Sequence, residues 1–353
     1  MTLREQIGQL IIAGVEGPEL SALERAWLNL IRPGGIILFR RNIEQALQVT
    51  TMLREATEIA GAPLFRCIDL EGGLVDRLRD LIAPMPSPAA VFATGKRAKF
   101  MQHGRLIARE AKMLGFNLVL APVLDLALPA SASVMQTRVV SADPAAVISY
   151  ASAFLEGLRT ESILGCGKHF PGLGGGTLDS HHATPLIERT WSDLWTQDLV
   201  PYRSLATKLP IIMVSHAAYP RIKNPIPASI STFWITTVLK KRIGYRGLIL
   251  SDDMEMGGIL TQVPIEDAAV MAVLAGTDII EICHNPSLIL RAYEAILAEA
   301  ERSAAFRRRV ASSSQRVSKF KNRHLNARMP RPASPSQIEK LRDAVKKFSG
   351  ELQ

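Results

Sequence analysis

Eight short runs of apolar, often β-branched residues recur along the first 290 residues, and amphipathic segments separate most of them. The runs cover residues 9–16, 34–39, 64–71, 117–125, 165–170, 210–218, 246–253 and 277–283. The segments at 43–60, 97–114, 145–160 and 230–243 have helical periodicity. Continuous apolar runs are typical of parallel strands that helices cover on both faces. The pattern predicts an α/β fold, a TIM-like (β/α)8 barrel, with an open doubly wound sheet as the alternative.

Polar residues stand where five of these predicted strands end. They are Asp69 and Glu71, Asp125, Lys168 and His169, Ser215 and His216, and Asp252 and Asp253. The C-terminal ends of the strands of a parallel barrel meet at one face, where barrel enzymes keep their chemistry. Each residue alone could simply cap its strand. Five polar strand ends together indicate a shared hydrated pocket, because buried charge needs partners.

Composition excludes several classes of protein. The chain has 353 residues, of which 47% are hydrophobic and 21% charged, so disorder and a disulfide scaffold are excluded. No run approaches the roughly 20 apolar residues of a membrane span, and the first 15 residues do not form a signal peptide. We therefore expect a cytoplasmic protein that does not enter the membrane. The three cysteines, Cys67, Cys166 and Cys283, lack metal-ligand spacing and are expected to be buried, inert thiols.

The net charge of +9 comes from the C-terminal part of the chain. Residues 301–353 hold 14 of the 42 Lys and Arg but four of the 33 Asp and Glu. We predict a barrel domain over 1–300 and a C-terminal helix with a basic tail over 301–353. The tail is expected to be a solvated helix and a loose end without a nucleic-acid partner. Two alternatives stay open: the tail binds nucleic acid, or residues 304–320 pack as the closing helix of the barrel.

The stretch from Lys168 to His181 carries the most specific chemistry. It runs from a strand end through a loop with four glycines into Asp179-Ser180-His181. Asp179 is close enough to orient the imidazole of His181, and such a pair transfers protons near neutral pH. A glycine-rich loop either moves or approaches a ligand closely. No metal is expected, although His169, His181, His182 and His216 could form a zinc site with Asp252 or Asp69.

Two other stretches supply carboxylates and a cation. Asp252 ends a strand ahead of a helix, a position that suits a nucleophile or an electrostatic stabiliser. Asp69 could accept hydrogen bonds from substrate hydroxyls, and Arg77 could bind an anionic or carbonyl group. For Glu71 we expect a structural ion pair with Arg77 below the pocket.

Three motifs in this order resemble family 3 glycoside hydrolases. They are Asp69-Leu-Glu-Gly-Gly-Leu-Val-Asp-Arg77, Lys168-His-Phe-Pro-Gly-Leu-Gly followed by Asp179-Ser-His181, and Ser251-Asp-Asp253. The resemblance spans about residues 5–300 and is strongest to members that remove N-acetylglucosamine from muropeptides in cell-wall recycling. Leu70, Leu74 and Leu173 depart from the usual family residues, and none of them is at an assigned catalytic position.

The resemblance implies a specific role for each of the named residues. Asp252 would be the nucleophile of a retaining exo-β-N-acetylglucosaminidase, and His181, oriented by Asp179, its general acid and base. Asp69, Arg77, Arg138, Lys168 and His169 would bind the sugar, with phosphorolysis as a possible side activity. A carbohydrate substrate, no cofactor, no metal and a monomer are expected. Specificity for glucose or xylose, or a weakly catalytic sugar-binding relative, stays open.

Overall fold

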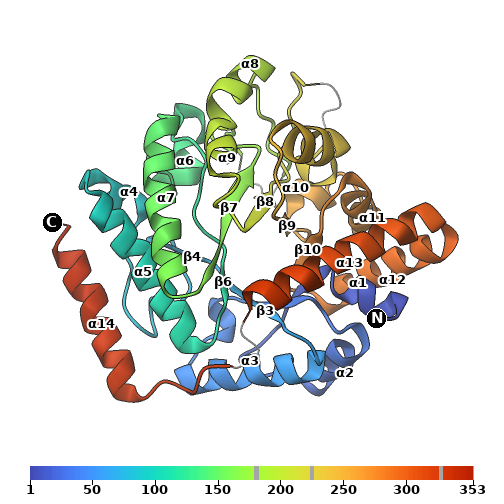
Figure 1. Cartoon of the computed structure of the whole chain (residues 1–353), viewed down its shortest axis with the longest axis horizontal. Helices are drawn as coiled ribbons and strands as arrows, with labels where there is room; N and C mark the ends of the chain where they lie inside the picture. The colour runs from blue at the N-terminus through green and yellow to red at the C-terminus, as the bar shows by residue number, and fades with distance from the viewer. Residues whose placement is uncertain (179–182, 223–225, 326–328, 353) are drawn as a thin grey trace.

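Eight parallel strands close into a barrel in the computed structural model, which describes residues 1–178, 183–222, 226–325 and 329–352. The order around the barrel is β1-β10-β9-β8-β7-β6-β3-β2 (Figure 1). The barrel strands are β1 (Ile11–Gly14), β2 (Gly35–Leu38), β3 (Phe65–Ile68), β6 (Leu118–Val119), β7 (Leu164–Phe170), β8 (Ile211–Val214), β9 (Leu248–Asp253) and β10 (Ile279–Ile282). The (β/α)8 prediction is confirmed, and the open sheet is excluded.

Helices surround the barrel as a ring in Figure 1. The larger ones are α2 (Ala22–Ile31), α3 (Ala46–Ala60), α5 (Arg97–Leu114), α7 (Pro144–Thr160), α11 (Ile265–Ala275), α12 (Pro286–Arg302), α13 (Ala304–His324) and α14 (Pro335–Gly350). The shorter ones are α1 (Leu3–Gly8), α4 (Pro88–Ala93), α6 (Ala132–Met135), α8 (Trp191–Asp193), α9 (Val200–Leu205) and α10 (Gly257–Leu260). Tighter or wider turns form η1 (Arg40–Asn42), η2 (Pro129–Ser131), η3 (Gln136–Arg138), η4 (Leu194–Asp198), η5 (Ala228–Ile230) and η6 (Phe233–Arg242).

Local sequence signals explain where several helices begin and end. The Ser21 hydroxyl caps α2 by accepting a hydrogen bond from the amide of Glu24, and the carboxylate of Glu24 accepts one from the amide of Ser21. Helices α3 and α5 both end in a left-handed glycine, Gly61 and Gly115, a conformation that residues with a Cβ rarely adopt. The amphipathic periodicity at 97–114 therefore gave the bounds of α5 correctly.

Most of the strands are shorter than the apolar runs that predicted them, and two of these runs change course at identifiable residues. The run at 64–71 stops at Ile68, and the chain continues into a small antiparallel hairpin of β4 (Leu70–Gly72) and β5 (Val75–Asp76). The run at 117–125 pairs only at Leu118 and Val119, apart from a single bridge at Val123. Pro122 has no amide hydrogen to offer a ladder. The first departure places Asp69 and Glu71 in the lining of a pocket, and the second leaves Asp125 to hold His169.

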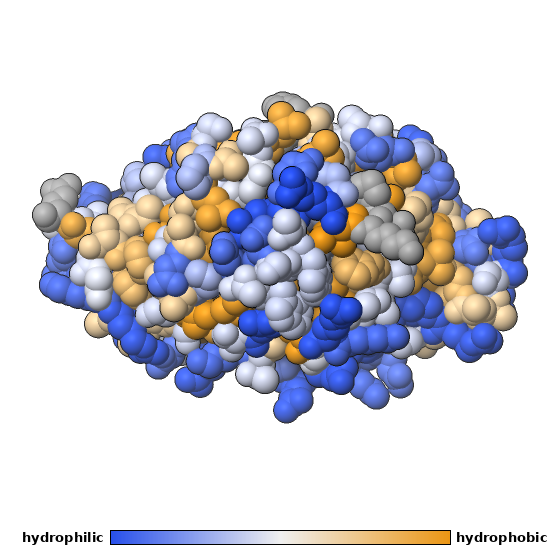
Figure 2. Space-filling model, turned by 90° about the horizontal axis from the view of Figure 1, so that it is seen from above, coloured by the Kyte–Doolittle hydropathy of each residue, from blue (hydrophilic) through white to orange (hydrophobic). Residues whose placement is uncertain are grey.

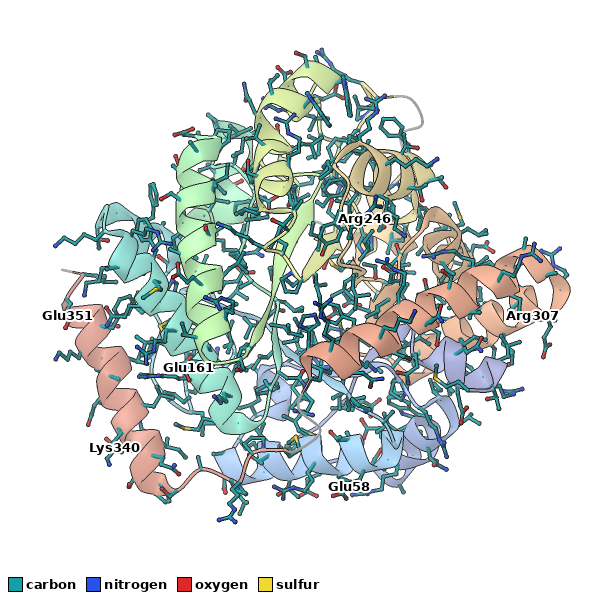
Figure 3. All side chains as sticks on the ribbon, in the orientation of Figure 1. Glu58, Glu161, Arg246, Arg307, Lys340 and Glu351 are labelled. Carbon is teal, nitrogen blue, oxygen red and sulfur yellow. The ribbon has the colours of Figure 1, made fainter. Side chains whose placement is uncertain are left out.

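The C-terminal region is folded against the barrel. Helix α13 crosses in front of the strands in Figure 1, and Phe306, Val310 and Val317 on it are buried. Helix α14 packs along α5 through Leu341, Val345 and Phe348, and Lys99 of α5 pairs with Glu351 at its far end (Figure 3). The expectation of a loose end is wrong for residues 335–350, because three apolar side chains of α14 are buried there. The closing-helix alternative describes α13.

The surface is mixed in character. In the view from above, hydrophilic residues are mixed with smaller hydrophobic patches (Figure 2). The hydrophilic residues predominate along the lower edge of Figure 2, which is the side that faces the viewer in Figure 1. Among the described residues, none of the helices is both long enough and apolar enough to cross a membrane.

Candidate active site

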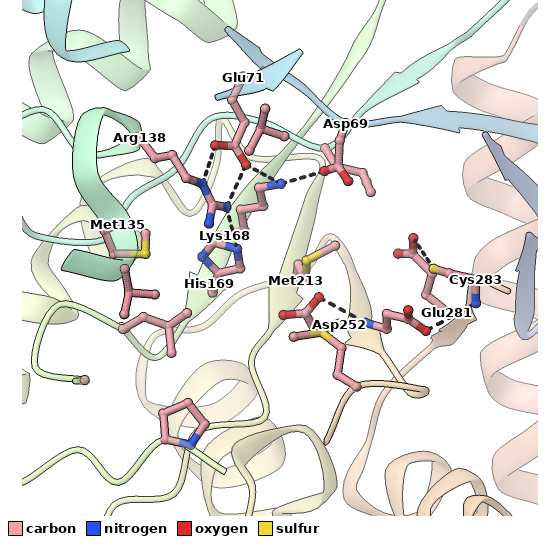
Figure 4. Close-up of a pocket in the computed structure, with 18 of the residues that line it drawn as sticks. Asp69, Glu71, Met135, Arg138, Lys168, His169, Met213, Asp252, Glu281 and Cys283 are labelled. Atoms are coloured by element: carbon pink, nitrogen blue, oxygen red, sulfur yellow. Dashed lines mark hydrogen bonds and ion pairs between the residues drawn. The ribbon is translucent and has the colours of Figure 1, made fainter. Parts of the chain in front are cut away.

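A pocket of about 180 Å3 lies at the C-terminal ends of the barrel strands (Figure 4). The residues predicted for the site that the structure describes all line it: Asp69, Arg77, Arg138, Lys168, His169 and Asp252. Pockets for drug-sized ligands measure roughly 300–1,000 Å3, so this one has room for a single small ring. The expectation that polar strand ends share one pocket is confirmed for Asp69, Glu71, Lys168, His169, Asp252 and Asp253. It is wrong for Asp125, Ser215 and His216, which are not among the lining residues.

A buried ion-pair network forms one wall of the pocket. Lys168 Nζ lies 2.7 Å from Asp69 Oδ1 and 2.7 Å from Glu71 Oε1. Arg138 donates two hydrogen bonds of 2.8 Å to the carboxylate of Glu71. Figure 4 shows Lys168 between the two carboxylates, with Arg138 on the other side of Glu71. The carboxylate of Glu71 thus holds both cations in place, while Asp69 keeps its second oxygen toward Arg77 at 3.4 Å.

The charges of this network fix its protonation. Burial opposes ionisation of Glu71, but the charges of Arg138 and Lys168 outweigh burial and lower its pKa to about 2. For Asp69, burial is likewise outweighed by Lys168 and Arg77, and its pKa falls well below the ordinary value. Burial alone would lower the pKa of Lys168, yet Asp69 and Glu71 raise it. The wall therefore presents ionised donors and acceptors at neutral pH, which suits recognition of sugar hydroxyls.

His169 is held from behind by Asp125. Its Nδ1 lies 2.6 Å from Asp125 Oδ2, and its Nε2 lies 3.4 Å from Arg138 Nη2. The other oxygen of Asp125 accepts a 2.7 Å hydrogen bond from the amide of Leu173. Asp125 thus fixes both the ring and the start of the glycine-rich loop. A Cβ at Gly174 would lie 2.5 Å from the carbonyl oxygen of Leu126, so this glycine serves close packing.

Asp252 stands on the opposite wall, at the end of β9. Its Oδ1 accepts a 3.0 Å hydrogen bond from the amide of Asp253, and the side chain is half-buried. His216 lies behind this wall, where its Nε2 is 2.8 Å from the carbonyl oxygen of Asp253 and its Nδ1 is 2.7 Å from Ser229 Oγ. Asp252 therefore keeps carboxylate lone pairs for the pocket, as a nucleophile requires.

The expected ion pair between Glu71 and Arg77 is wrong. Glu71 pairs with Arg138 and Lys168, and Arg77 pairs with Asp69. Residue 77 follows the β4–β5 hairpin, which turns it toward Asp69, whereas Glu71 points to the segment that carries Arg138. No pattern in the sequence indicates that the segment carrying Arg138 folds back to Glu71.

Glu281 of β10 also lines the pocket, and it was not among the site residues predicted from the sequence. Glu281 is buried, and its Oε1 lies 3.4 Å from the thiol of Cys283. Burial, together with the nearby Asp69, Asp253 and Asp252, raises the pKa of Glu281 well above its ordinary value. A charged residue inside the run Ile279-Ile280-Glu281-Ile282 was a readable signal, because a strand interior rarely holds an acid without purpose. The three cysteines are free and buried, as expected.

Asp179 and His181 lie outside the described residues, as does His182. The described chain on either side of them reaches the pocket, because Leu178 before them and Pro185 after them both line it. The predicted acid–base role of His181 and the orienting role of Asp179 stay predictions.

The zinc alternative loses two of its described members. His169 is engaged by Asp125, and His216 by Ser229 and the backbone of Asp253. Within the described ranges, one group of three side chains has ligand atoms within 4.8 Å of one another: Asp253, Glu255 and His284. Hydrogen bonds to Asp253 and Glu255 raise the pKa of His284 to about 9. A cationic imidazole between two carboxylates is an ion pair and a poor metal ligand.

The fold and the pocket together define a barrel enzyme that places ionised carboxylates and cations around one small ring. Comparison with known proteins makes the class specific. The family description "Glycosyl hydrolase family 3 N terminal domain" matches residues 2–320. A β-hexosaminidase of Idiomarina loihiensis is 35% identical over 317 residues, which cover 88% of this chain and 95% of that protein.

Solved structures agree. The β-N-acetylhexosaminidase of Beutenbergia cavernae superimposes with a TM-score of 0.85 at 25% identity, covering 91% of this chain and 99% of that one. A fungal multi-domain family 3 β-N-acetylglucosaminidase gives a TM-score of 0.93 at 29% identity, with 99% of this chain covered but only 42% of the fungal chain. The chain therefore belongs to family 3 of the glycoside hydrolases.

Proposed function

We propose that this protein is an exo-acting β-N-acetylhexosaminidase that removes terminal β-linked N-acetylglucosamine with retention of configuration. One observation supports the proposal most: a pocket for a single ring has Asp252 on one wall and the network of Asp69, Lys168 and Arg138 on the other. The curated relatives at about one-third identity are named β-hexosaminidases.

In the first step the carboxylate of Asp252 attacks the anomeric carbon of the bound sugar. The bond between that carbon and the leaving oxygen breaks as a glycosyl-enzyme ester forms, and His181 gives its proton to the leaving oxygen. Water then attacks the anomeric carbon while His181 takes a proton from it, and the bond between that carbon and the Asp252 oxygen breaks, which releases the sugar and the carboxylate. Asp179 orients the imidazole of His181 and stabilises its cation.

The ion-pair wall binds and orients the sugar. Asp69 accepts hydrogen bonds from hydroxyls, Lys168 and Arg138 donate them, and Arg77 and His169 complete the ring of polar contacts. Glu71 acts through Lys168 and Arg138, which it positions. Preorganised charges of this kind are worth more in a buried pocket than in water, because they need no reorganisation when the reaction begins.

We propose that the natural substrate is an N-acetylglucosaminyl muropeptide. We also propose that the protein acts as a monomer in the cytoplasm. The three free thiols suit a reducing compartment. Glucose or xylose specificity is the second candidate, and a weakly catalytic sugar-binding protein is the third. Both of these candidates would keep the same polar wall of the pocket. They differ from the proposed activity in the rate expected on the acetylated sugar.

The test is hydrolysis of 4-nitrophenyl β-glycosides of N-acetylglucosamine, glucose and xylose by the purified chain. We expect kcat/KM to favour the acetylated sugar strongly and the first product to keep the β configuration by NMR. Activity should withstand a chelator, and inhibition by the chelator would revive a metal centre. Preference for glucose would contradict the proposed specificity, and binding without turnover of any of the three would contradict catalysis.

A further inference from the structure

A second hollow, of about 690 Å3, lies at the opposite end of the barrel from the pocket. Its walls come from the end of α7, the segment before β7, the turn after α9, the segment from η6 to β9, and the end of α13. We call this hollow the basal groove. Strand β9 separates it from Asp252: Arg246 precedes the strand and Asp252 nears its end. Six residues of strand span roughly 20 Å, so the basal groove is a separate site.

The charged residues that line the basal groove are all basic. They are Arg159, Arg203, Lys208, Arg246, Arg323 and His324. Among the residues that the structure describes, the lining holds no Asp or Glu, although the chain as a whole carries 33 of them. Figure 3 labels Arg246 on one side of the end of α13 and Glu161, which follows α7, on the other.

These cations keep donors for a ligand. Within the part of the chain that the structure describes, none of the five Lys and Arg residues of the groove forms an ion pair with a carboxylate. Lys208 Nζ donates to Ser152 Oγ at 2.9 Å, and the guanidinium of Arg203 stands 4.5 Å from the ring centroid of Trp195. Burial and the neighbouring Arg323 lower the pKa of His324, which is the direction that a positive potential produces.

Helix ends alone do not account for this gathering. Cations near a helix C-terminus stabilise the helix dipole, and Arg159, Arg203, Arg323 and His324 all lie in last turns. Helices α2, α3 and α11 end without a basic residue in the last turn. Lys208 and Arg246 belong to no helix. The basic residues are thus concentrated under β7 to β9 rather than spread over all the helix ends.

The groove also has an apolar wall. Leu155, Leu209 and Phe320 line it beside the cations, and the ring of His324 packs 4.4 Å from that of Phe320. The volume falls within the range of small-molecule sites, which combine apolar walls with a few polar groups. Arginine and lysine recognise phosphate groups through charge-assisted hydrogen bonds.

We propose that the basal groove binds a small organic polyphosphate, with two or more phosphate groups on an aromatic body, which is the chemistry of a nucleoside di- or triphosphate. The phosphates lie against Arg159, Arg246 and Arg323, and the aromatic body lies against Leu209 and Phe320. This site is independent of the proposed glycosidase activity, because it shares no residue with the pocket.

The test is isothermal titration calorimetry of the full chain at physiological salt with ATP, ADP, adenosine and tripolyphosphate. We expect one saturable site for ATP and ADP and none for adenosine. Arg159→Glu and Arg246→Glu, both at exposed positions, should each weaken ATP binding by about tenfold, the loss of one charge-assisted contact. Melting temperatures show whether each variant is folded.

Arg308→Glu is the matched control, because Arg308 is exposed on α13 and does not line the groove. It makes the same change of charge and should leave ATP binding unchanged. An equal loss in this control, or the absence of saturable binding, would overturn the proposal. Tripolyphosphate binding as tightly as ATP would overturn the assignment of an aromatic body.

Two further arms separate the groove from other sources of binding. Saturating N-acetylglucosamine should not displace ATP, and displacement would overturn the proposal by placing the anion in the pocket. A single-stranded oligonucleotide should bind less tightly than ATP. Tighter binding of the oligonucleotide with the same sensitivity to Arg159→Glu would overturn the small-molecule assignment in favour of nucleic acid.

Discussion

Arg138 and Glu71 meet in a two-pronged ion pair: Nε lies 2.8 Å from Oε2, and Nη2 lies 2.8 Å from Oε1. The two residues are 67 positions apart in the chain, and Glu71 is almost fully buried. The pair ties the segment after β6 to the hairpin after β3 and so forms one side of the pocket. It couples the shape of the site to the stability of the fold.

Breaking this pair should destabilise the protein. Arg138→Met leaves the carboxylate of Glu71 with Lys168 as its remaining cation, and removal of one partner of a buried pair costs about 3–5 kcal/mol. The free energy of unfolding from urea titration measures the loss. The exposed pair of Arg97 and Glu156 supplies the control, because Arg97→Met should cost at most about 1 kcal/mol. Equal costs for the two variants would contradict the role given to burial.

Asp252→Asn should abolish turnover while the fold persists. The amide cannot form the ester intermediate, so we expect kcat to fall by about three or more powers of ten. Asp267→Asn, at an exposed helical position, is the control and should keep full activity. A mechanism-based 2-fluoro sugar followed by peptide mapping should label Asp252, and a label on another side chain would assign the nucleophile elsewhere.

The proposed role of His181 as proton donor predicts a dependence on the leaving group. His181→Ala should lower kcat/KM much more on a natural disaccharide than on an aryl glycoside, because a good leaving group needs little protonation. The comparison requires both substrates with wild type and variant at several pH values. Equal losses on the two substrates would speak against a proton donor and for a structural role.

Phosphate should act as an acceptor in place of water. An imidazole carries no fixed negative charge, so His181 does not repel an incoming phosphate as a carboxylate would. In phosphate buffer we expect part of the product as a sugar 1-phosphate, detectable by phosphorus NMR. Only free sugar at high phosphate would show that the glycosyl-enzyme excludes phosphate.

The buried side chain of Lys321 should make the stability of the fold depend on pH in the alkaline range. Its side chain is buried, with Nζ 2.7 Å from Gln9 Oε1, and burial lowers its pKa to about 7 from the model-compound value of 10.5. Between these two values the unfolded chain holds a proton that the folded chain lacks, so Lys321 makes the free energy of unfolding rise with pH, as does Lys240, whose pKa burial lowers to about 8. His284, whose pKa is raised to about 9, makes the free energy of unfolding fall over part of the same range. The slope that Lys321 contributes is at most about 1.4 kcal/mol per pH unit.

Urea titrations from pH 7 to 9.5 test this prediction. Lys321→Met should make the slope of the free energy of unfolding against pH less positive than in wild type, and Lys319→Met, at an exposed position on the same helix, should leave the slope unchanged. An unchanged slope in Lys321→Met would assign the proton to another group.

The sequence predicted the barrel and most of the pocket because both depend on local pattern. Buried strands need continuous apolar runs, and the charged residues at their ends must share a hydrated pocket. Asp69, Lys168 and Asp252 could therefore be placed together from the sequence. The partner of Glu71 could not be predicted, because the sequence offers both Arg77 and Arg138 as cations. Only the path of residues 120–138 in the fold brings Arg138 to Glu71. That course depends on how the segment after Val119 leaves the sheet, which periodicity does not encode.

The fate of the basic C-terminal region was also beyond local pattern. Helix α14 carries many charges, and its apolar stripe of Leu341, Val345 and Phe348 becomes meaningful only against the exposed side of α5. The division of the chain at residue 300 stays a prediction. The match of the family description as far as residue 320 is consistent with α13 closing the barrel end.

Barrel closure has a consequence for biosynthesis. Strand β1 pairs with β10, so that Ile11 lies beside Ile280, and a Cβ at Gly14 would lie 1.8 Å from the carbonyl oxygen of Cys283. A nascent chain on the ribosome therefore exposes one edge of its first strand until nearly the whole barrel has been translated. Unpaired edges recruit other strands, so cells that make this protein rapidly should require chaperone protection of that edge.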